Sequence, residues 1–295
     1  MKFIIDTDIG DDYDDIFTLA VALASPEVDL LGVTTVGGDV ALRARLTRRF
    51  LELAERSDIP VAIGAPQPVR AQFSHRRWAQ AAPPLAGAQP DAVAFILDQA
   101  RAHPGEITLL AIGPLSNVAA AVSRDPEGFG KLARIVLMGG SVRRGYRDLP
   151  WRPASGPSAE YNIVQDIPAA QTVFDSGLPL LVAPLDATMV ALDEAKRMQI
   201  FTRSTPITDA LALTYLQWTA ASGRALPILF DTIALAAALD PGVCQTEPLR
   251  LQVDAEGYTR LTEGPPNAEV CVDCDEDRFC RWMMPRLLGG APRDA

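Results

Sequence analysis

Short apolar segments alternate with longer amphipathic segments along most of the chain. Leucine and β-branched residues concentrate at positions 3–5, 28–35, 60–63, 107–112, 135–138 and 178–182. Short continuous runs of this kind are typical of strands that are buried on both faces. Between them, apolar residues recur with helical spacing over 15–24, 41–55, 90–102, 115–124 and 167–175. These stretches are predicted to form amphipathic helices.

The alternation of strand and helix predicts an α/β fold. Parallel strands need crossover connections, and helices packed on both faces of the sheet normally supply them. We therefore expect a mostly parallel, Rossmann-like central sheet flanked by helices, with ligands bound at the carboxyl ends of its strands. No linker or repeat divides residues 1–295. One domain is expected, with a flexible tail after about residue 288.

Two stretches, 66–87 and 141–158, are rich in glycine, proline, arginine and aromatic residues. Neither shows a helical or strand period, so both are interpreted as loops. Loops this long in a compact domain are often binding elements, although a solvated surface loop has the same composition.

Composition narrows the function further. The chain has 48% hydrophobic and 22% charged residues, which is typical of a globular protein with a sizeable core. Its formal net charge of -10 disfavours nucleic acid and anionic membranes as partners. No apolar run is long enough to span a membrane, and the apolar run before the first aspartate has only three residues, 3–5. A cytoplasmic location is therefore expected.

The four cysteines lie in the last fifth of the chain. Cys271 and Cys274 form a C-x-x-C motif, which is compatible with a redox pair or half of a zinc site. Both histidines lie far away in the sequence, and the motif continues a predicted strand instead of opening a helix. We therefore favour free thiols in a reducing compartment.

An acidic cluster follows the first predicted strand. Six aspartates occupy ten positions in the segment Asp6-Thr7-Asp8-Ile9-Gly10-Asp11-Asp12-Tyr13-Asp14-Asp15. Carboxylates this close raise one another's pKa unless a cation neutralises them, and oxygen-only donors suit Ca²⁺ or Mg²⁺. An EF-hand is excluded, because Phe17 stands where the loop needs glutamate. The segment predicts a divalent metal site in preference to a bare acidic turn.

A D-x-D motif after the first strand also occurs in haloacid dehalogenase-like phosphatases, which use Mg²⁺ and a nucleophilic aspartate. That chemistry needs a lysine near the phosphate. Lys131 precedes a predicted strand, which places it at the opposite edge of the sheet. A Mg²⁺-dependent phosphatase is therefore the alternative and not the first choice.

Further motifs follow the acidic cluster in a fixed order. They are GVTTVGGD at 32–39, GPLSN at 113–117, VLMGG at 136–140, AEYN at 159–162, FD at 230–231 and PNAEVCVD at 266–273. Together with the opening D-x-D-x-G and the pair Asp14-Asp15, this series resembles the inosine–uridine-type nucleoside hydrolases over nearly the whole chain. The resemblance implies the nucleoside hydrolase fold and a homodimer or homotetramer.

The activity that the resemblance implies is hydrolysis of a small-molecule ribonucleoside to ribose and free base. By the same resemblance, Asp8 would bind Ca²⁺ and act as general base toward a metal-bound water. The other metal ligands would be Asp15, the main-chain carbonyl of Ile112 and Asp231. The family usually has threonine at position 112, but a carbonyl ligand tolerates this change.

The resemblance also assigns the substrate contacts. Asp14, Glu160 and Asn162 would hold ribose hydroxyls, Met138 would pack on the sugar, and Phe230 would line the pocket for the base. Asp39 stands where many members carry asparagine near the ribose and the metal.

The chain departs from the family pattern at the turn. Asp12 and Tyr13 make it two residues longer than the simplest form, and we match Asp14-Asp15 to the family pair because the helix that follows keeps its register. Asp11 or Asp12 remains a possible contributor to the site.

Two further departures concern the substrate. Phe230 replaces the histidine that serves many members as leaving-group acid. Ala154 replaces an asparagine, so one ribose contact is missing or is supplied from elsewhere in the loop. Base activation would then depend on another donor, a better leaving group or aromatic stacking. The candidates for these roles are His75, Trp78, Tyr146 and Trp151. A non-catalytic riboside-binding protein is a second alternative, and the preferred base stays open.

Overall fold

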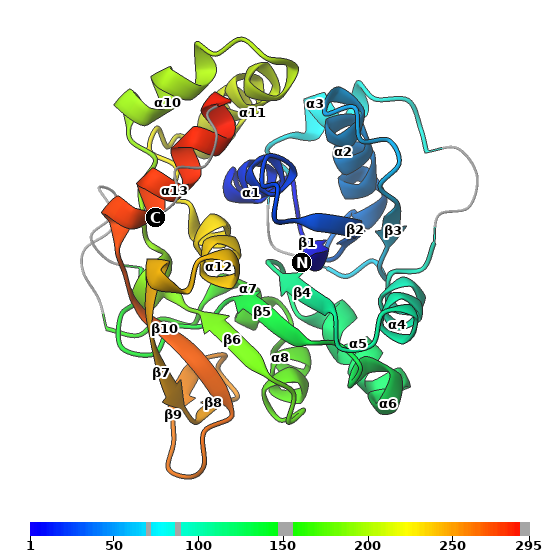
Figure 1. Cartoon of the computed structure of the whole chain (residues 1–295), viewed down its shortest axis with the longest axis vertical. Helices are drawn as coiled ribbons and strands as arrows, with labels where there is room; N and C mark the ends of the chain where they lie inside the picture. The colour runs from blue at the N-terminus through cyan, green and yellow to red at the C-terminus, as the bar shows by residue number, and fades with distance from the viewer. Residues whose placement is uncertain (69–71, 86–89, 147–155, 290–295) are drawn as a thin grey trace.

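The computed structural model describes residues 1–68, 72–85, 90–146 and 156–289, and Figure 1 shows its course from the first strand to the last helix. The predicted flexible tail falls almost entirely outside the described residues. Trp151 and Ala154 also lie outside them.

An eight-stranded sheet forms the centre of the fold, in the order β3-β2-β1-β4-β5-β6-β10-β7. Its strands are β1 (Lys2–Thr7), β2 (Asp29–Thr35), β3 (Val61–Ile63), β4 (Ile107–Ala111), β5 (Arg134–Met138), β6 (Leu180–Ala183), β7 (Cys244–Leu249) and β10 (Ala268–Cys274). Only β7 runs antiparallel to its neighbour. The expected single α/β domain with a mostly parallel sheet is confirmed, as are all six predicted strands.

The chain winds from β1 outward through β2 to β3, and then returns to the other side of β1 to form β4, β5 and β6. The winding therefore reverses between β1 and β4. In doubly wound sheets a crevice opens at this switch point, outside the carboxyl ends of the two strands. The acidic cluster follows β1 and so lies at this crevice.

Helices cover both faces of the sheet (Figure 1). One layer contains α1 (Asp14–Leu23), α2 (Val40–Leu53), α12 (Phe230–Leu239) and α13 (Glu276–Leu288). The other contains α4 (Ala92–Ala102), α5 (Ser116–Arg124), α6 (Pro126–Phe129) and α8 (Ile167–Phe174). All five predicted helices are present.

The remaining elements lie around these layers. They are α3 (Arg76–Gln80), α7 (Tyr161–Gln165), α9 (Leu185–Thr188), α10 (Glu194–Phe201), α11 (Pro206–Ser222), the 3₁₀ turn η1 (Pro241–Val243) and the hairpin of β8 (Leu251–Val253) with β9 (Thr259–Leu261). Helix α3 lies within the stretch 66–87, which was interpreted as a loop. The C-x-x-C motif lies in β10, a strand as predicted, and all four cysteines are free.

Each central strand contributes to two separate cores. Phe3 and Ile5 of β1 pack into the core beneath α1 and α12, while Ile4 packs into the core beneath α4 and α5. Successive side chains of a strand point to opposite faces. Because both faces are covered, these strands are continuous apolar runs and not alternating ones.

A buried polar contact joins the centre of the sheet to α5. The Asp6 carboxylate accepts hydrogen bonds from the Thr34 hydroxyl of β2 and, at 2.8 Å, from the Asn117 side-chain amide. Asn117 also donates to the carbonyl of Thr35. Burial raises the pKa of Asp6 to about 6. Three sequence motifs therefore meet at one point, where they join β1, β2 and α5.

No helix in the described part of the chain is long and apolar enough to cross a membrane.

His75 is fully buried beneath the turn that follows β1. Its main-chain N–H donates to the carbonyl of Gly10, and neither ring nitrogen has a hydrogen-bond partner among the described residues. Burial lowers the pKa of His75 to about 4, and the nearby main chain of Thr214 offsets only part of this effect. The imidazole is therefore neutral at pH 7.

We predict that His75 makes the fold acid-sensitive. Its pKa in the folded state lies below the value of 6.5 for an ordinary histidine. The unfolded chain therefore binds this proton first as the pH falls. The stability contribution is intact above pH 6.5 and is lost progressively toward pH 4. Between pH 8 and pH 5, the wild type should lose about 2 kcal/mol more unfolding free energy than His75→Leu.

Urea unfolding at several pH values measures this difference. Carboxylates titrate in both proteins and cancel in the comparison. Parallel pH profiles for wild type and variant would show that His75 is not held neutral.

Candidate active site

A cavity of about 640 Å³ opens at the carboxyl ends of the central strands. Its wall includes residues from the turn after β1, from α7 and from the start of α12. Nine of the ten predicted site residues line it: Asp8, Asp14, Asp15, Ile112, Met138, Glu160, Asn162, Phe230 and Asp231. Segments more than 200 residues apart in sequence therefore meet here.

Asp39 is the predicted site residue that the structure does not bring into the cavity. It is exposed and forms the N-cap of α2, where its carboxylate accepts a hydrogen bond from the main-chain N–H of Leu42 at 3.0 Å. An aspartate just before a helix commonly takes this role, because it satisfies an N–H group that has no partner within the helix. The capping role therefore gives a reason for an aspartate at position 39.

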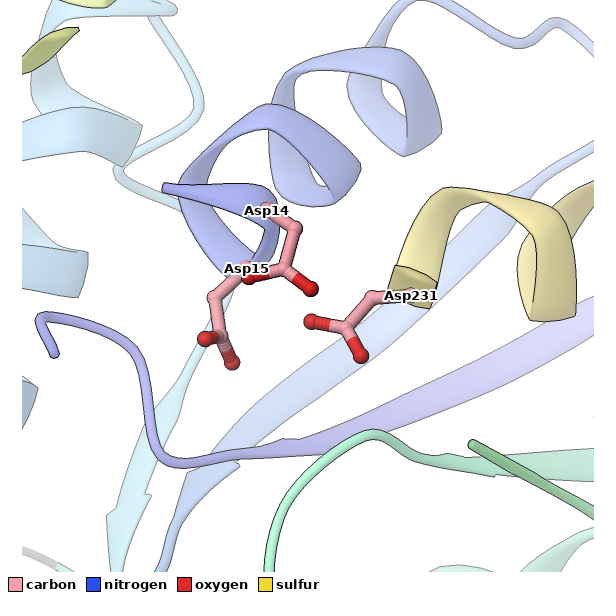
Figure 2. Close-up of side chains that lie close together, drawn as sticks. All are labelled: Asp14, Asp15 and Asp231. Atoms are coloured by element: carbon pink, nitrogen blue, oxygen red, sulfur yellow. The ribbon is translucent and has the colours of Figure 1, made fainter. Parts of the chain in front are cut away.

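Three buried carboxylates form the centre of the site (Figure 2). Asp14 and Asp15 come from the first turn of α1, and Asp231 comes from the first turn of α12. One oxygen from each lies within 4.8 Å of the others. Burial raises their pKa values well above the ordinary range, and repulsion between neighbouring aspartates adds to the effect.

This cluster differs in one respect from the predicted ligand set. Asp14, which was assigned to the ribose, belongs to the tight group with Asp15 and Asp231, while Asp8 lies outside that group. Asp8 lines the same cavity, and its charge raises the pKa of all three. Burial raises the pKa of Asp8 itself to about 7, and the positive charge of Arg43 offsets part of the rise.

The donor set fits a hard divalent cation. Every donor in the cluster is a carboxylate oxygen, and each of the three aspartates is at most 5% exposed. Negative charges held this close in a buried site repel one another unless a cation is bound between them. Oxygen donors of this kind suit Ca²⁺ or Mg²⁺ better than softer metals.

The longer turn after β1 packs against aromatic side chains of the core. Gly10 has a φ of +126°, a conformation that L side chains rarely adopt, and the ring of Phe73 lies where its Cβ would be. Tyr13 is fully buried, packs against Trp218 and donates its hydroxyl hydrogen bond to the carbonyl of Leu211 at 3.2 Å. The two extra residues therefore bring an aromatic anchor into the core, and Asp14 and Asp15 follow it in the first turn of α1.

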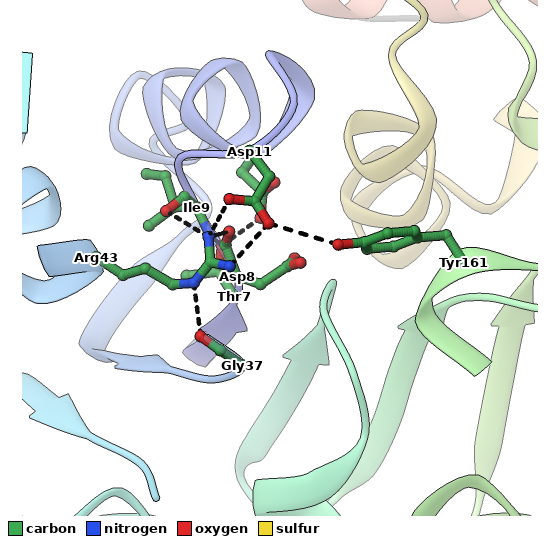
Figure 3. A network of polar contacts seen from close by, with 8 residues as sticks. Thr7, Asp8, Ile9, Asp11, Gly37, Arg43 and Tyr161 are labelled. Carbon is green, nitrogen blue, oxygen red and sulfur yellow. Dashed lines mark hydrogen bonds and ion pairs between the residues drawn. The ribbon is translucent and has the colours of Figure 1, made fainter. Parts of the chain in front are cut away.

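Arg43 fastens the same turn from the side of α2 (Figure 3). Its guanidinium donates to the main-chain carbonyls of Asp8, Ile9 and Gly37, and it forms a two-pronged ion pair with Asp11. The Arg43 side chain is 1% exposed. It thus places a positive charge next to the acidic cluster while it fixes the backbone that carries Asp8.

Glu160 is held by main-chain N–H groups. It caps α7, and its two carboxylate oxygens accept from the N–H groups of Asn162 at 3.0 Å, Gly140 at 3.1 Å and Ile163 at 3.2 Å. The Asn162 side-chain amide donates to the carbonyl of Met138 at 3.2 Å. The motifs at 136–140 and 159–162 therefore form one unit that faces the cavity.

The aromatic candidates separate into two groups. Tyr146 and Phe230 line the cavity and make an edge-on contact, with ring centroids 6.3 Å apart. His75 and Trp78 are buried outside the cavity wall, and Trp78 packs against Phe50. Neither can contact a ligand in this arrangement.

The sequence did not single out Tyr161 and Arg224, both of which line the cavity. Tyr161 lies between two residues that were assigned to the ribose, and that position was a usable signal. Arg224 follows α11 in a segment without any motif, so nothing in the local pattern pointed to it. Asp11 and Asp12, which were left open, are also in the wall.

The phosphatase alternative has no structural support. Lys131 precedes β5 and its carbonyl accepts from the N–H of Gly105, at the end of the sheet away from the aspartates. Among the described residues that line the cavity there is no lysine.

A doubly wound sheet with buried carboxylates gathered at its switch point defines an α/β enzyme with a candidate cation site. The sequence matches the inosine-uridine preferring nucleoside hydrolase family over residues 3–281. The chain belongs to this family. It is a hydrolase that acts on N-glycosyl compounds, and its family activity is ribonucleoside hydrolysis.

Individual relatives match over nearly their whole length. The chain is 40% identical to the uncharacterized protein C1683.06c of Schizosaccharomyces pombe, covering 97% of this chain and 99% of that protein. It is 34% identical to the pyrimidine-specific ribonucleoside hydrolase RihA of Salmonella arizonae, with 97% and 98% covered. The purine-preferring ribonucleoside hydrolase from Gardnerella vaginalis has a similar structure, with a TM-score of 0.84, 27% identity and 98% of both chains covered.

We predict that Arg43→Met strongly destabilises the fold. The substitution leaves Asp11 without its ion-pair partner beside other carboxylates and removes donors from three buried carbonyls. Breaking a buried pair from one side costs about 3–5 kcal/mol of unfolding free energy. Urea unfolding measures the loss.

Arg45→Met is the matched control, because Arg45 lies on the same helix and also donates to two main-chain carbonyls, but at a partly exposed position. Its cost should be about 1 kcal/mol. Equal losses of unfolding free energy in the two variants would show that the contacts of Arg43 contribute no more to stability than those of Arg45.

Proposed function

We propose that this protein cleaves the N-glycosidic bond of ribonucleosides in a Ca²⁺-dependent reaction and releases ribose and free base. The observation that carries the proposal is the cluster of Asp14, Asp15 and Asp231 in a cavity that also holds Asp8 and Glu160. We further propose a homodimer or homotetramer, on the family resemblance alone, and a location in the cytoplasm, on the sequence pattern alone.

The ligands proposed for Ca²⁺ are Asp8, Asp15, Asp231 and the main-chain carbonyl of Ile112. When bound, the ion would offset the carboxylate charge, lower the pKa of a bound water and bind ribose hydroxyls. Asp14 lies within 4.8 Å of Asp15 and Asp231. Its carboxylate can therefore accept a hydrogen bond from a ribose hydroxyl immediately beside the ion.

The remaining roles are proposed for Glu160, Asn162, Met138 and Asp8, all of which line the cavity. Glu160 and Asn162 would bind ribose hydroxyls, since their orientation is already fixed by main-chain contacts. Met138, 3% exposed, would pack against the sugar. Breaking the glycosidic bond builds positive charge on the ribose, and surrounding carboxylates stabilise that charge. Asp8 would take a proton from the attacking water.

The base that is cleaved is open, because one relative is named as pyrimidine-specific and one similar structure as purine-preferring. A panel of purine, pyrimidine and modified ribonucleosides, followed by a reducing-sugar assay, gives the rank order. The matching 2′-deoxyribonucleosides should react far more slowly, because the proposed ribose contacts need both hydroxyls. Binding of ribosides without release of sugar from any of them would favour the alternative of a non-catalytic binding protein.

Removal of metal should abolish ribose release, and added Ca²⁺ should restore it. Binding to the folded state alone also stabilises the fold, by about 3 kcal/mol at a Ca²⁺ concentration 100-fold above Kd. Thermal unfolding with and without Ca²⁺ therefore reports binding independently of activity. Full turnover after chelation, with no shift of the melting temperature, would exclude a required metal.

Asp8→Asn should lower kcat by about 1,000-fold, because the amide keeps the shape of the side chain but cannot accept the proton. The fold should not be destabilised, since one of several repelling charges is removed. Asp58→Asn is the control: Asp58 is an exposed aspartate paired with Arg56 and lies outside the cavity. Wild-type kcat in Asp8→Asn would rule out Asp8 as the general base.

A further inference from the structure

The cavity wall carries one positively charged side chain among the described residues, Arg224. It lies two residues beyond the end of α11 and six residues before Phe230, which cannot donate a proton to a departing base. The following inference rests on the proposed ribonucleoside hydrolysis and concerns the other half of that reaction, the departure of the base.

Burial divides the cavity into a deep end and a mouth. At the deep end, Asp14 and Asn162 are each 5% exposed. At the mouth, the side chain of Arg224 is 38% exposed, and that of its neighbour Asp12 is 36% exposed. A nucleoside with its ribose at the deep end would project its base toward the mouth, and so toward Arg224.

Several contacts determine where Arg224 lies. The left-handed Gly223, with a φ of +71°, ends α11, and the main-chain N–H of Arg224 donates to the Ser222 hydroxyl at 3.1 Å. The guanidinium lies 5.6 Å from the ring centroid of Trp218 and 3.5 Å from the carboxylate of Asp12. Trp218 is buried and packs against Tyr13. Asp12, one of the two residues that lengthen the turn, therefore helps to orient the guanidinium of Arg224 at the mouth of the cavity.

Other described groups in the wall are less suited to assist the base. The Tyr161 hydroxyl donates to Asp11 at 3.4 Å, and burial together with nearby carboxylates raises the pKa of Tyr161 far above its usual range. Tyr146 donates to Glu160 at 3.5 Å. Both hydroxyls are thus directed at carboxylates of the site.

We propose that Arg224 is a catalytic residue that stabilises the departing base as an anion. As the C1′–N bond breaks, its electron pair stays with the base, the water oxygen bonds to C1′, and Asp8 takes one proton of that water. The guanidinium donates hydrogen bonds to the base without losing a proton, because its pKa is too high for proton transfer. The released base then takes a proton from solvent.

This mechanism specifies a class of substrate. It suits bases whose negative charge is shared with a ring carbonyl oxygen, such as uracil or hypoxanthine, since that oxygen can accept from a guanidinium. Adenine lacks such an oxygen and depends on protonation of the ring. Adenosine should therefore be the poorer substrate.

The test compares leaving groups in the wild type, Arg224→Met and Arg224→Lys. Uridine and inosine need help to release the base, whereas 4-nitrophenyl β-D-riboside releases a stable anion without it. Removing one donor of this type typically costs 10²–10³-fold in kcat. Arg224→Met should therefore lose about 100-fold or more on the two nucleosides and at most several-fold on the nitrophenyl riboside. Arg224→Lys, which keeps the charge, should lie between the wild type and Arg224→Met.

Arg260→Met is the matched control, because Arg260 also lies beside an aspartate, Asp254, and over an aromatic ring, Tyr258, but outside the cavity. It should keep wild-type rates on all substrates. Equal losses by Arg224→Met on nucleosides and nitrophenyl riboside would overturn the proposed role of Arg224 but would leave the proposed function of the protein intact. So would a wild type that cleaves the nitrophenyl riboside but neither nucleoside. A wild type that cleaves no riboside would overturn the proposed function as well.

Discussion

Repulsion among buried carboxylates is the constraint on which the rest of this structure depends. Asp8, Asp14, Asp15 and Asp231 share one cavity, and the charges of Asp8 and Asp14 raise the pKa values of Asp15 and Asp231. The surrounding fold supplies compensation from several directions. The Thr7 hydroxyl donates to Asp15, and the Arg43 guanidinium lies against the turn. These contacts offset only part of the repulsion, so the cluster suits a bound cation and, in the proposed reaction, a sugar that gains positive charge.

The doubly wound topology determines where this charge can be gathered. Strand β1 delivers the aspartates, β4 leads to Ile112, and α12 brings Asp231 from a distant part of the sequence to the same crevice. The Asp6 contact with Thr34 and Asn117 joins β1 and β2, on one side of the switch point, to α5. Acidic side chains therefore lie at two levels: Asp6 joins elements of the sheet to α5, and the others line the cavity.

Sequence patterns predicted the central sheet, its flanking helices and most of the buried residues that line the cavity. The apolar runs at 3–5 and 107–112 were diagnostic because both faces of the sheet are covered. Motif order placed Asp231 and Glu160, which local pattern alone would have left as a helix cap and as part of an exposed strand. Asp39 shows the converse case, because it caps α2 outside the cavity wall, whereas the family position suggests a contact near the ribose. Arg43 and Arg224 were missed because their partners, Asp11 and Asp12, are 32 and 212 positions away, and helix periodicity carries no information at that range.

The longer turn has a consequence for how this chain can change over time. Tyr13 is locked into the aromatic core, Asp11 is paired with Arg43, and Asp12 is paired with Arg224. Deleting one residue would rotate α1 by about 100° about its axis and carry Asp14 and Asp15 away from Asp231. Deleting both Asp12 and Tyr13 would keep the helix register more nearly, but it would remove the aromatic anchor and leave Arg224 without its ion-pair partner. Asp12 and Tyr13 are therefore tied to Arg224 and Trp218, and the length of the turn cannot change by one residue without moving the carboxylates of the site.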